Sequence, residues 1–97
     1  MLYALMCKDK PNSLDKRMAE RPAHVEHLKA LDAQGILKMA GPLLDDDEKP
    51  MGSLVMIAAD SKAEAEAIAA RDPYAIAGLF ESVEVRAYNW VFKNPEA

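Results

Sequence analysis

The 97-residue sequence has little of several residue types, and each shortage excludes a class of protein. Its one cysteine, Cys7, cannot form an internal disulfide. No apolar run reaches the roughly 20 residues of a membrane-spanning helix, and no basic-then-apolar segment indicates a secretory leader. Lys and Arg form no block, so neither nucleic acid nor a membrane surface is an expected partner. We therefore expect a cytoplasmic protein whose partner is a small ligand or another protein.

Hydrophobic residues make up 51% of the chain, which is enough for one core and too little for two domains. Residues 1–97 are therefore expected to form a single domain. The net charge of −4 comes from mixed signs, and the acidic stretch at residues 44–50 is expected to be a solvated loop. No Gly-rich phosphate loop, Gly-x-Ser-x-Gly elbow or paired-cysteine motif is present, so nucleophilic catalysis by Ser or Cys has no support.

Hydrophobic periodicity predicts four strands and two helices in the order βαββαβ. The strands are expected over residues 2–7, 36–43, 52–59 and 81–92, and the helices from Ser13 to about Gln34 and over residues 60–71. Pro22 is expected to bend the first helix or to divide it. This order is typical of the ferredoxin-like α+β fold, a four-stranded antiparallel sheet with two helices on one face.

The sheet face without helices is expected to be apolar. Its side of the last strand includes Tyr88, Trp90 and Phe92, and the strand at residues 52–59 is apolar on both faces. Since an exposed apolar patch of this size is unusual in a monomer, we expect a homodimer packed through this face. The alternative is that Trp90 folds over its own sheet.

Three polar residues, Arg17, Arg21 and His24, follow one row of the first helix, inside its apolar stripe. A row of this kind is suited to a cavity that takes a small anionic or phenolic ligand, although ion pairing alone would also explain it. Glu20 and His27 could join His24 in a metal site, but the spacing is a weak signal and no metal or other cofactor is expected.

A carboxylate in the stretch "RDPY" is a second candidate. Asp72 suits the N-cap of a short helix, Pro73 its first position, and Gly78 a left-handed residue after its end. In the predicted fold both helices cover the same sheet face, so Asp72 and His24 can meet. A carboxylate bound to one ring nitrogen would fix the tautomer and make the other nitrogen a general base.

The segments "SLDKRMAERPAHVEHL", "AGPL" with "GSLVMI", and "RDPYAIAGLFESVEVR" resemble the YciI family, also called YCII-related proteins. The resemblance implies a dimeric α/β barrel, as in muconolactone isomerases, with a site built on the histidine of "RPAH" and the aspartate of "DPY". It implies six site residues in this chain: His24 and Asp72 as the catalytic pair, and Arg17, Arg21, Ser53 and Tyr74 as substrate-binding residues. Family relatives include an enzyme that removes HCl from a chlorinated hydroxyquinol.

Two departures from the family pattern and three functions stay open. The loop from Leu44 to Met51 is shorter than the Gly-rich loop of many relatives, and Ala87 stands where proline is common. The first function is a cofactor-independent lyase or isomerase, in which His24 is the acid/base and Asp72 orients it. The second is a binding or accessory module that holds a metabolite unchanged. The third is a purely structural dimer unit.

Overall fold

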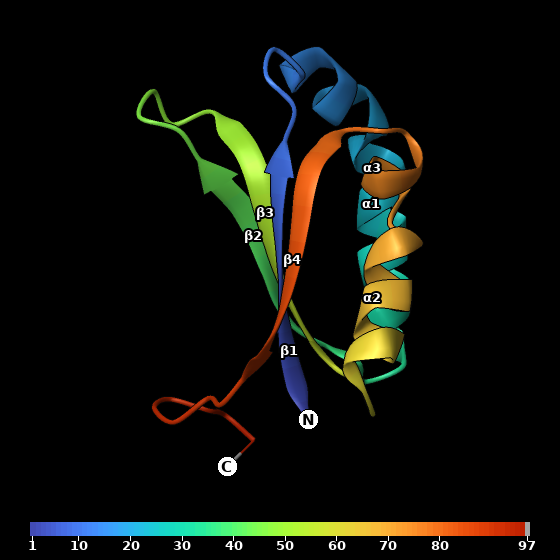
Figure 1. Cartoon of the computed structure of the whole chain (residues 1–97), viewed down its shortest axis with the longest axis vertical. Coiled ribbons are helices and arrows are strands. Elements are labelled where there is room, and N and C mark those ends of the chain that lie inside the picture. Colours follow the sequence, from blue (N-terminus) through green and yellow to red (C-terminus); the bar gives the residue numbers. More distant parts are fainter. Residues whose placement is uncertain (97) are drawn as a thin grey trace.

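The computed structural model describes residues 1–96, with four strands and three helices (Figure 1). The strands are β1 (Leu2–Asp9), β2 (Leu37–Leu44), β3 (Pro50–Ala58) and β4 (Phe80–Tyr88), and the helices are α1 (Leu14–Ala33), α2 (Lys62–Ala70) and the single turn α3 (Pro73–Ile76). The predicted ferredoxin-like α+β fold is confirmed, and α3 is the short helix for which Asp72 was the expected N-cap.

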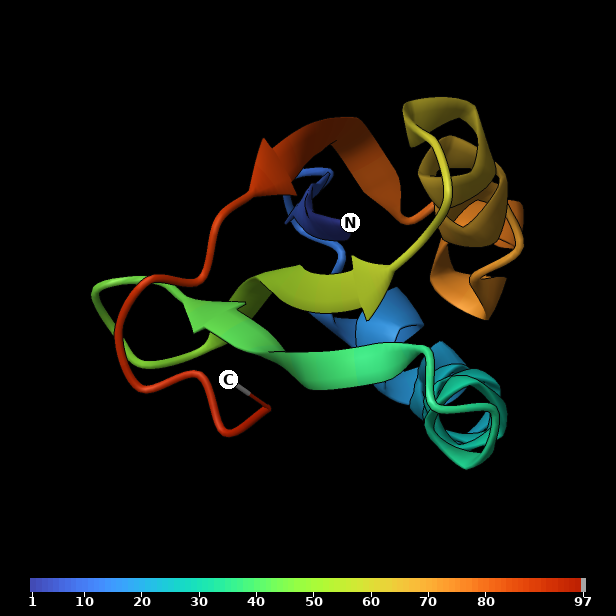
Figure 2. The ribbon, with the colours of Figure 1, turned by 90° about the horizontal axis from the view of Figure 1, so that it is seen from below.

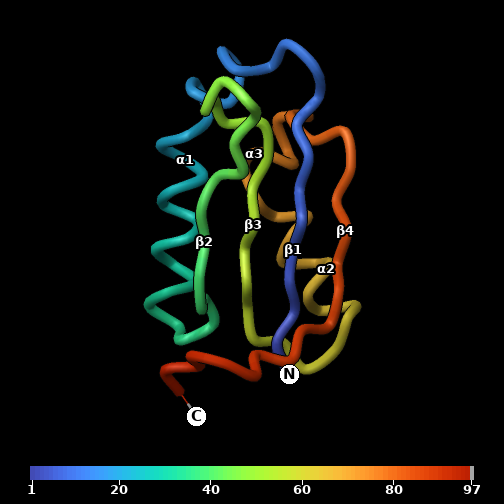
Figure 3. Tube along the Cα trace, turned by 90° about the vertical axis from the view of Figure 1, so that its left-hand side faces the viewer, coloured from blue at the N-terminus to red at the C-terminus, as the bar shows by residue number. Residues whose placement is uncertain are grey.

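All neighbouring strands pair antiparallel, in the order β2-β3-β1-β4 (Figure 3). The helices lie on one face of this sheet, and the core fills the space between them and the sheet (Figure 2). Alternate residues of β1 and β3 point into the core, among them Tyr3, Leu5, Val55 and Ile57. No helix within residues 1–96 is long and apolar enough to cross a membrane.

The predicted C-terminal ends of the first and last strands were wrong. Strand β1 runs to Asp9 rather than residue 7, and it pairs with β4 to its end through an irregularity between Lys8 and Asp9. Strand β4 ends at Tyr88 rather than residue 92. The following segment lies on the side of the sheet away from the helices (Figure 2), where Glu96 accepts a 2.8 Å hydrogen bond from Lys38 of β2. Trp90 and Phe92, which were expected in the last strand, therefore lie outside it.

Helix α1 is one continuous helix, although Pro22 lies inside it. Pro22 is exposed, so the backbone bond that it cannot form is lost on the solvent side. Ser13 occupies the N-cap position but does not cap with its side chain, since its Oγ donates to the Pro11 carbonyl oxygen instead. With the helix undivided, His24 faces the sheet and is 7% exposed.

Candidate active site

A cavity of about 270 Å³ lies between α1, α3 and the strands β2 and β3. Five of the six predicted site residues line it, namely Arg17, Arg21, His24, Ser53 and Tyr74. Most of the other lining side chains are apolar, including Val25, Leu28 and Val55. An apolar cavity of this size with a few convergent polar groups suits a ligand of about one ring.

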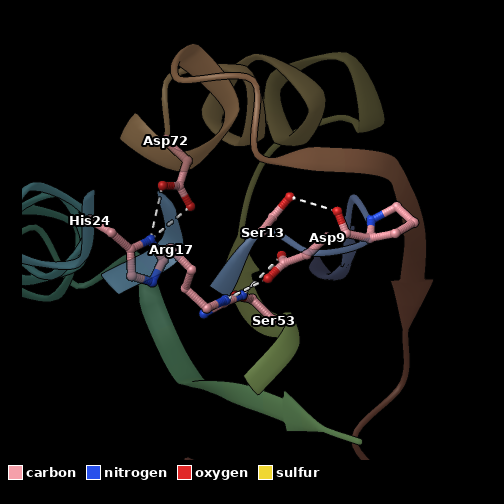
Figure 4. A network of polar contacts seen from close by, with 7 residues as sticks. Asp9, Ser13, Arg17, His24, Ser53 and Asp72 are labelled. Atoms are coloured by element: carbon pink, nitrogen blue, oxygen red, sulfur yellow. Dashed lines mark hydrogen bonds and ion pairs between the residues drawn. The ribbon is translucent and has the colours of Figure 1, made fainter. Parts of the chain in front are cut away.

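The sixth predicted residue, Asp72, lies beside His24 and forms a buried pair with it (Figure 4). His24 Nδ1 lies 2.9 Å from Asp72 Oδ1 and 3.0 Å from Oδ2. An ionised carboxylate only accepts hydrogen bonds, so Nδ1 is the donor in the neutral imidazole and Nε2 carries the lone pair. The two residues are 48 positions apart in the sequence, and α1 and α3 bring them together.

The second ring nitrogen of His24 is open to the cavity. Within residues 1–96 His24 Nε2 has no hydrogen-bond partner, whereas every fully buried side-chain nitrogen or oxygen of those residues has one. Nε2 therefore keeps contact with the cavity that His24 lines. Asp72 therefore fixes the tautomer of His24 through Nδ1, and Nε2, which can accept a proton, is left on the side of the cavity.

The local sequence explains why Asp72 holds its position. Asp72 has extended backbone angles and caps α3, accepting a 2.9 Å hydrogen bond from the Tyr74 N–H, and Pro73 occupies the first turn. Gly78 follows α3 with a φ of +76°, as predicted for a left-handed residue after the helix. Asp72 Oδ1 thus accepts from both Tyr74 N and His24 Nδ1, so the residue is a helix cap and the partner of His24 at once.

Tyr74 lines the cavity next to the imidazole of His24. Its ring stacks on His24 with centroids 4.0 Å apart and an angle of 14°, and it meets the edge of Phe80 at 6.0 Å. Burial raises the pKa of Tyr74 more than the nearby Arg17 charge lowers it, so the phenol stays protonated at neutral pH. Tyr74 is 1% exposed, and within residues 1–96 its hydroxyl makes no hydrogen bond, although its side chain lines the cavity.

The two arginines of the predicted row differ in their surroundings. Arg17 is buried and pairs with Asp9 (Nε to Oδ2, 2.7 Å), and its Nη2 donates to Ser53 Oγ at 2.7 Å. Arg21 lies exposed at the rim, and no carboxylate of residues 1–96 lies within ion-pair distance of it. Arg21 is thus the cavity-lining cation without an ion-pair partner among residues 1–96, whereas the charge of Arg17 is paired.

Asp9 was missed at the sequence level, although a signal for it was present. Tyr3, Leu5 and Cys7 point inward, and the same alternation places Asp9 on the inward face of β1. A strand that ends at residue 7 leaves Asp9 outside the sheet. A charged residue that continues an inward-facing row needs a buried partner, and Arg17 is that partner.

Two other reactive side chains lie outside this arrangement. Burial raises the pKa of Cys7 from 9.0 to about 12, with Asp72 adding to the effect, so its thiol is a poor nucleophile. His27 does not line the cavity, and burial lowers its pKa. In the described part of the chain, no three His, Cys, Asp or Glu side chains gather as a metal-binding cluster.

The fold and the buried pair define a class: a ferredoxin-like protein with a carboxylate-oriented imidazole in a small cavity. The chain belongs to the YCII-related domain family, whose model matches residues 1–89. Protein YciI of Escherichia coli O6:H1 is 40% identical over 98 residues, which cover 95% of this chain and 100% of that protein. The predicted family membership is confirmed.

Two solved structures are similar to this chain, the first in sequence and fold and the second in fold. A 5-chloro-2-hydroxyhydroquinone dehydrochlorinase from Burkholderia phenoliruptrix, in complex with 2,5-dihydroxybenzoquinone, is 32% identical with a TM-score of 0.82, and the match covers 92% of this chain and 94% of that one. A putative antibiotic biosynthesis monooxygenase from Nitrosomonas europaea has a TM-score of 0.57 at 13% identity, covering 95% and 90% of the chains. The second likeness concerns the fold alone.

Proposed function

We propose that this protein is a cofactor-independent enzyme of the lyase or isomerase type, which removes a proton from a small cyclic substrate that carries an anionic group. The observation that supports this most is His24 Nε2, which has no partner within residues 1–96 and faces the cavity, while Nδ1 is held by Asp72. A positioned acid/base group of this kind contributes about 10²- to 10⁴-fold to a rate.

In the proposed step, Nε2 accepts a proton from a substrate atom and the bonding electrons form the new double bond. In an elimination, the leaving group departs with the electron pair of its own bond; in an isomerisation, His24 returns the proton to another atom. Tyr74 donates a hydrogen bond to the oxygen where negative charge develops, and Arg21 pairs with the anionic group. Arg17 and Ser53 complete the polar wall.

The similar dehydrochlorinase suggests the first substrate to try, because its reaction is the loss of HCl from a hydroxylated ring and its structure holds a dihydroxyquinone. We expect wild-type protein to release chloride from 5-chloro-2-hydroxyhydroquinone. His24→Gln should lower this rate about 10²- to 10⁴-fold. His27→Gln is the matched control, since His27 lies three residues on in the same helix and outside the cavity.

Two results would contradict the proposed enzyme. Retained turnover in His24→Gln would remove the imidazole from the mechanism. Wild-type protein that binds 2,5-dihydroxybenzoquinone but transforms no ring substrate over hours would favour the non-catalytic binding module. Binding in that case should still weaken in Arg21→Gln, because Arg21 is the cation at the cavity rim.

We also propose that the protein is a homodimer packed through the sheet face opposite the helices. Met39 and Tyr88 on this face are 43% and 45% exposed, and Leu54 at its centre is half-buried. Glu84 and Arg86 on β4 place a negative and a positive charge on this face. In a dimer with a two-fold axis, each charge can lie opposite the other sign on the second copy. Sedimentation should give twice the chain mass for wild type and a monomer for Leu54→Lys; a monomeric wild type would contradict the proposal.

A further inference from the structure

Asp9 and Arg17 form a buried pair in which Arg17 lines the cavity and Asp9 does not. Asp9 is 8% exposed and Arg17 is 4% exposed, and two hydrogen bonds join them, from Arg17 Nε at 2.7 Å and from Nη2 at 3.2 Å. Ser53 Oγ accepts a third at 2.7 Å (Figure 4). A guanidinium held at three points has little freedom to turn toward any other acceptor.

Only two buried carboxylates occur among residues 1–96, Asp9 and Asp72. Arg17 and Asp72 both reach Tyr74: the Arg17 Cζ lies 4.6 Å from the centre of the Tyr74 ring, and Asp72 accepts from the Tyr74 backbone N–H. If Arg17 lost Asp9, its buried charge would be uncompensated, which is costly, and Asp72 would be the remaining buried carboxylate. Arg17 and His24 would then compete for Asp72.

We propose that Asp9 is a positioning residue, which holds Arg17 away from Asp72 and so reserves Asp72 for His24. The assignment separates two ion pairs that share one cavity wall: Asp9 with Arg17, and Asp72 with His24. It also leaves Arg21 as the cation for a ligand, because the charge of Arg17 is already compensated. This role rests on the proposed acid/base function for its purpose, but the charge arrangement can be tested without any substrate.

The test measures the tautomer of His24 by long-range proton–nitrogen NMR of the ¹⁵N-labelled protein. In wild type we expect one tautomer, with Nδ1 protonated by its bond to Asp72. In Asp9→Asn we expect this single pattern to be lost and the two ring nitrogens to give averaged shifts, because Arg17 takes Asp72. If Asp9 only stabilises the fold, Asp9→Asn will unfold at lower urea and keep the wild-type tautomer, and that result overturns the proposal.

A second variant tests whether Arg17 competes with His24 for Asp72 or instead stabilises the site. Asp9→Asn with Arg17→Gln contains neither charge of the pair, so nothing competes with His24 for Asp72. We expect the wild-type tautomer to return in this double variant. Averaged shifts in it would mean that Arg17 supports the site rather than threatens it, and would overturn the proposal. The double variant leaves no unpaired charge at this position, so we expect it to fold, and averaged shifts in it overturn the proposal even if Asp9→Asn does not fold.

These outcomes do not depend on turnover. If wild type shows the fixed tautomer and Asp9→Asn loses it, but no ring substrate reacts, the positioning role stands and the proposed enzyme fails. If substrate reacts and Asp9→Asn keeps both the tautomer and the wild-type kcat, the proposed enzyme stands and the positioning role fails.

Discussion

Asp72 has two roles in the structure, and two substitutions can separate them. Asp72 caps α3 through Tyr74 N and also binds His24 Nδ1. Asparagine is as good an N-cap as aspartate and still offers one oxygen, so Asp72→Asn keeps the cap and removes the charge. Alanine removes both. The difference between wild type and Asp72→Asn therefore isolates what the carboxylate charge does for His24, and Asp72→Ala adds the loss of the cap.

The expected magnitudes follow from these contacts. A hydrogen bond to a charged group contributes about 1.5–3 kcal/mol and a neutral one about 0.5–1.5 kcal/mol, so Asp72→Asn should lower the free energy of unfolding by about 1 kcal/mol. Asp72→Ala also loses the cap, worth about 1 kcal/mol, and leaves the buried Nδ1 donor unpaired, so we expect a loss of about 3 kcal/mol.

Urea unfolding and chloride release measure the two effects separately. Both variants should lose about 10²- to 10⁴-fold in turnover, although Asp72→Asn keeps most of its stability. If Asp72→Asn unfolds like wild type and turns over within a few-fold of it, Asp72 is a helix cap only, and the account of the pair is refuted. Equal and large stability losses in both variants would show that the cap had been misjudged.

Three further predictions concern residues around the site. With a pKa of about 12 rather than 9.0, Cys7 in native protein should react with iodoacetamide roughly 10³-fold more slowly than in urea, and equal rates would contradict its burial. Burial lowers the pKa of His27 below 6.5 in the folded state, so the unfolded state binds its proton first and stability falls as the pH drops below 6.5. Urea unfolding of His27→Gln should lack that part of the decline, and an unchanged pH profile would contradict it. A Cβ at Gly52 would overlap the backbone carbonyl oxygen of Cys7, so Gly52→Ala should cost about 1–3 kcal/mol, whereas Gly41→Ala, with open space around it, should cost less than about 0.5 kcal/mol.

The arrangement of strands and helices could be predicted because its signals are local. The apolar strand predicted over residues 52–59 and the helical period of residues 13–34 correspond to β3 and α1 in the structure. The end of β4 could not be predicted in the same way. Alternation continues through Trp90 to Phe92, but the chain leaves the sheet after Tyr88, and Glu96 contacts Lys38 on a strand far away in the sequence.

The candidate site shows the same division. Asp72 as a cap, Pro73 and Gly78 follow from local rules, and the fold order brings α1 and α3 together. The partner of Arg17 did not follow, because it required the exact end of β1, where Asp9 meets Arg17 of α1. Sequence periodicity shows which face a residue takes, whereas the pairing of two buried charges depends on tertiary distances.

The most direct test of the central claim is the tautomer of His24 in the wild-type protein. Long-range proton–nitrogen NMR at about pH 8.5, above the ordinary titration range of histidine, reports which ring nitrogen carries the proton. The structure predicts a protonated Nδ1 held by Asp72 and an Nε2 with a free lone pair that shifts when 2,5-dihydroxybenzoquinone is added. A protonated Nε2 would contradict the account, because the imidazole would then face the cavity as a donor and could not accept a substrate proton.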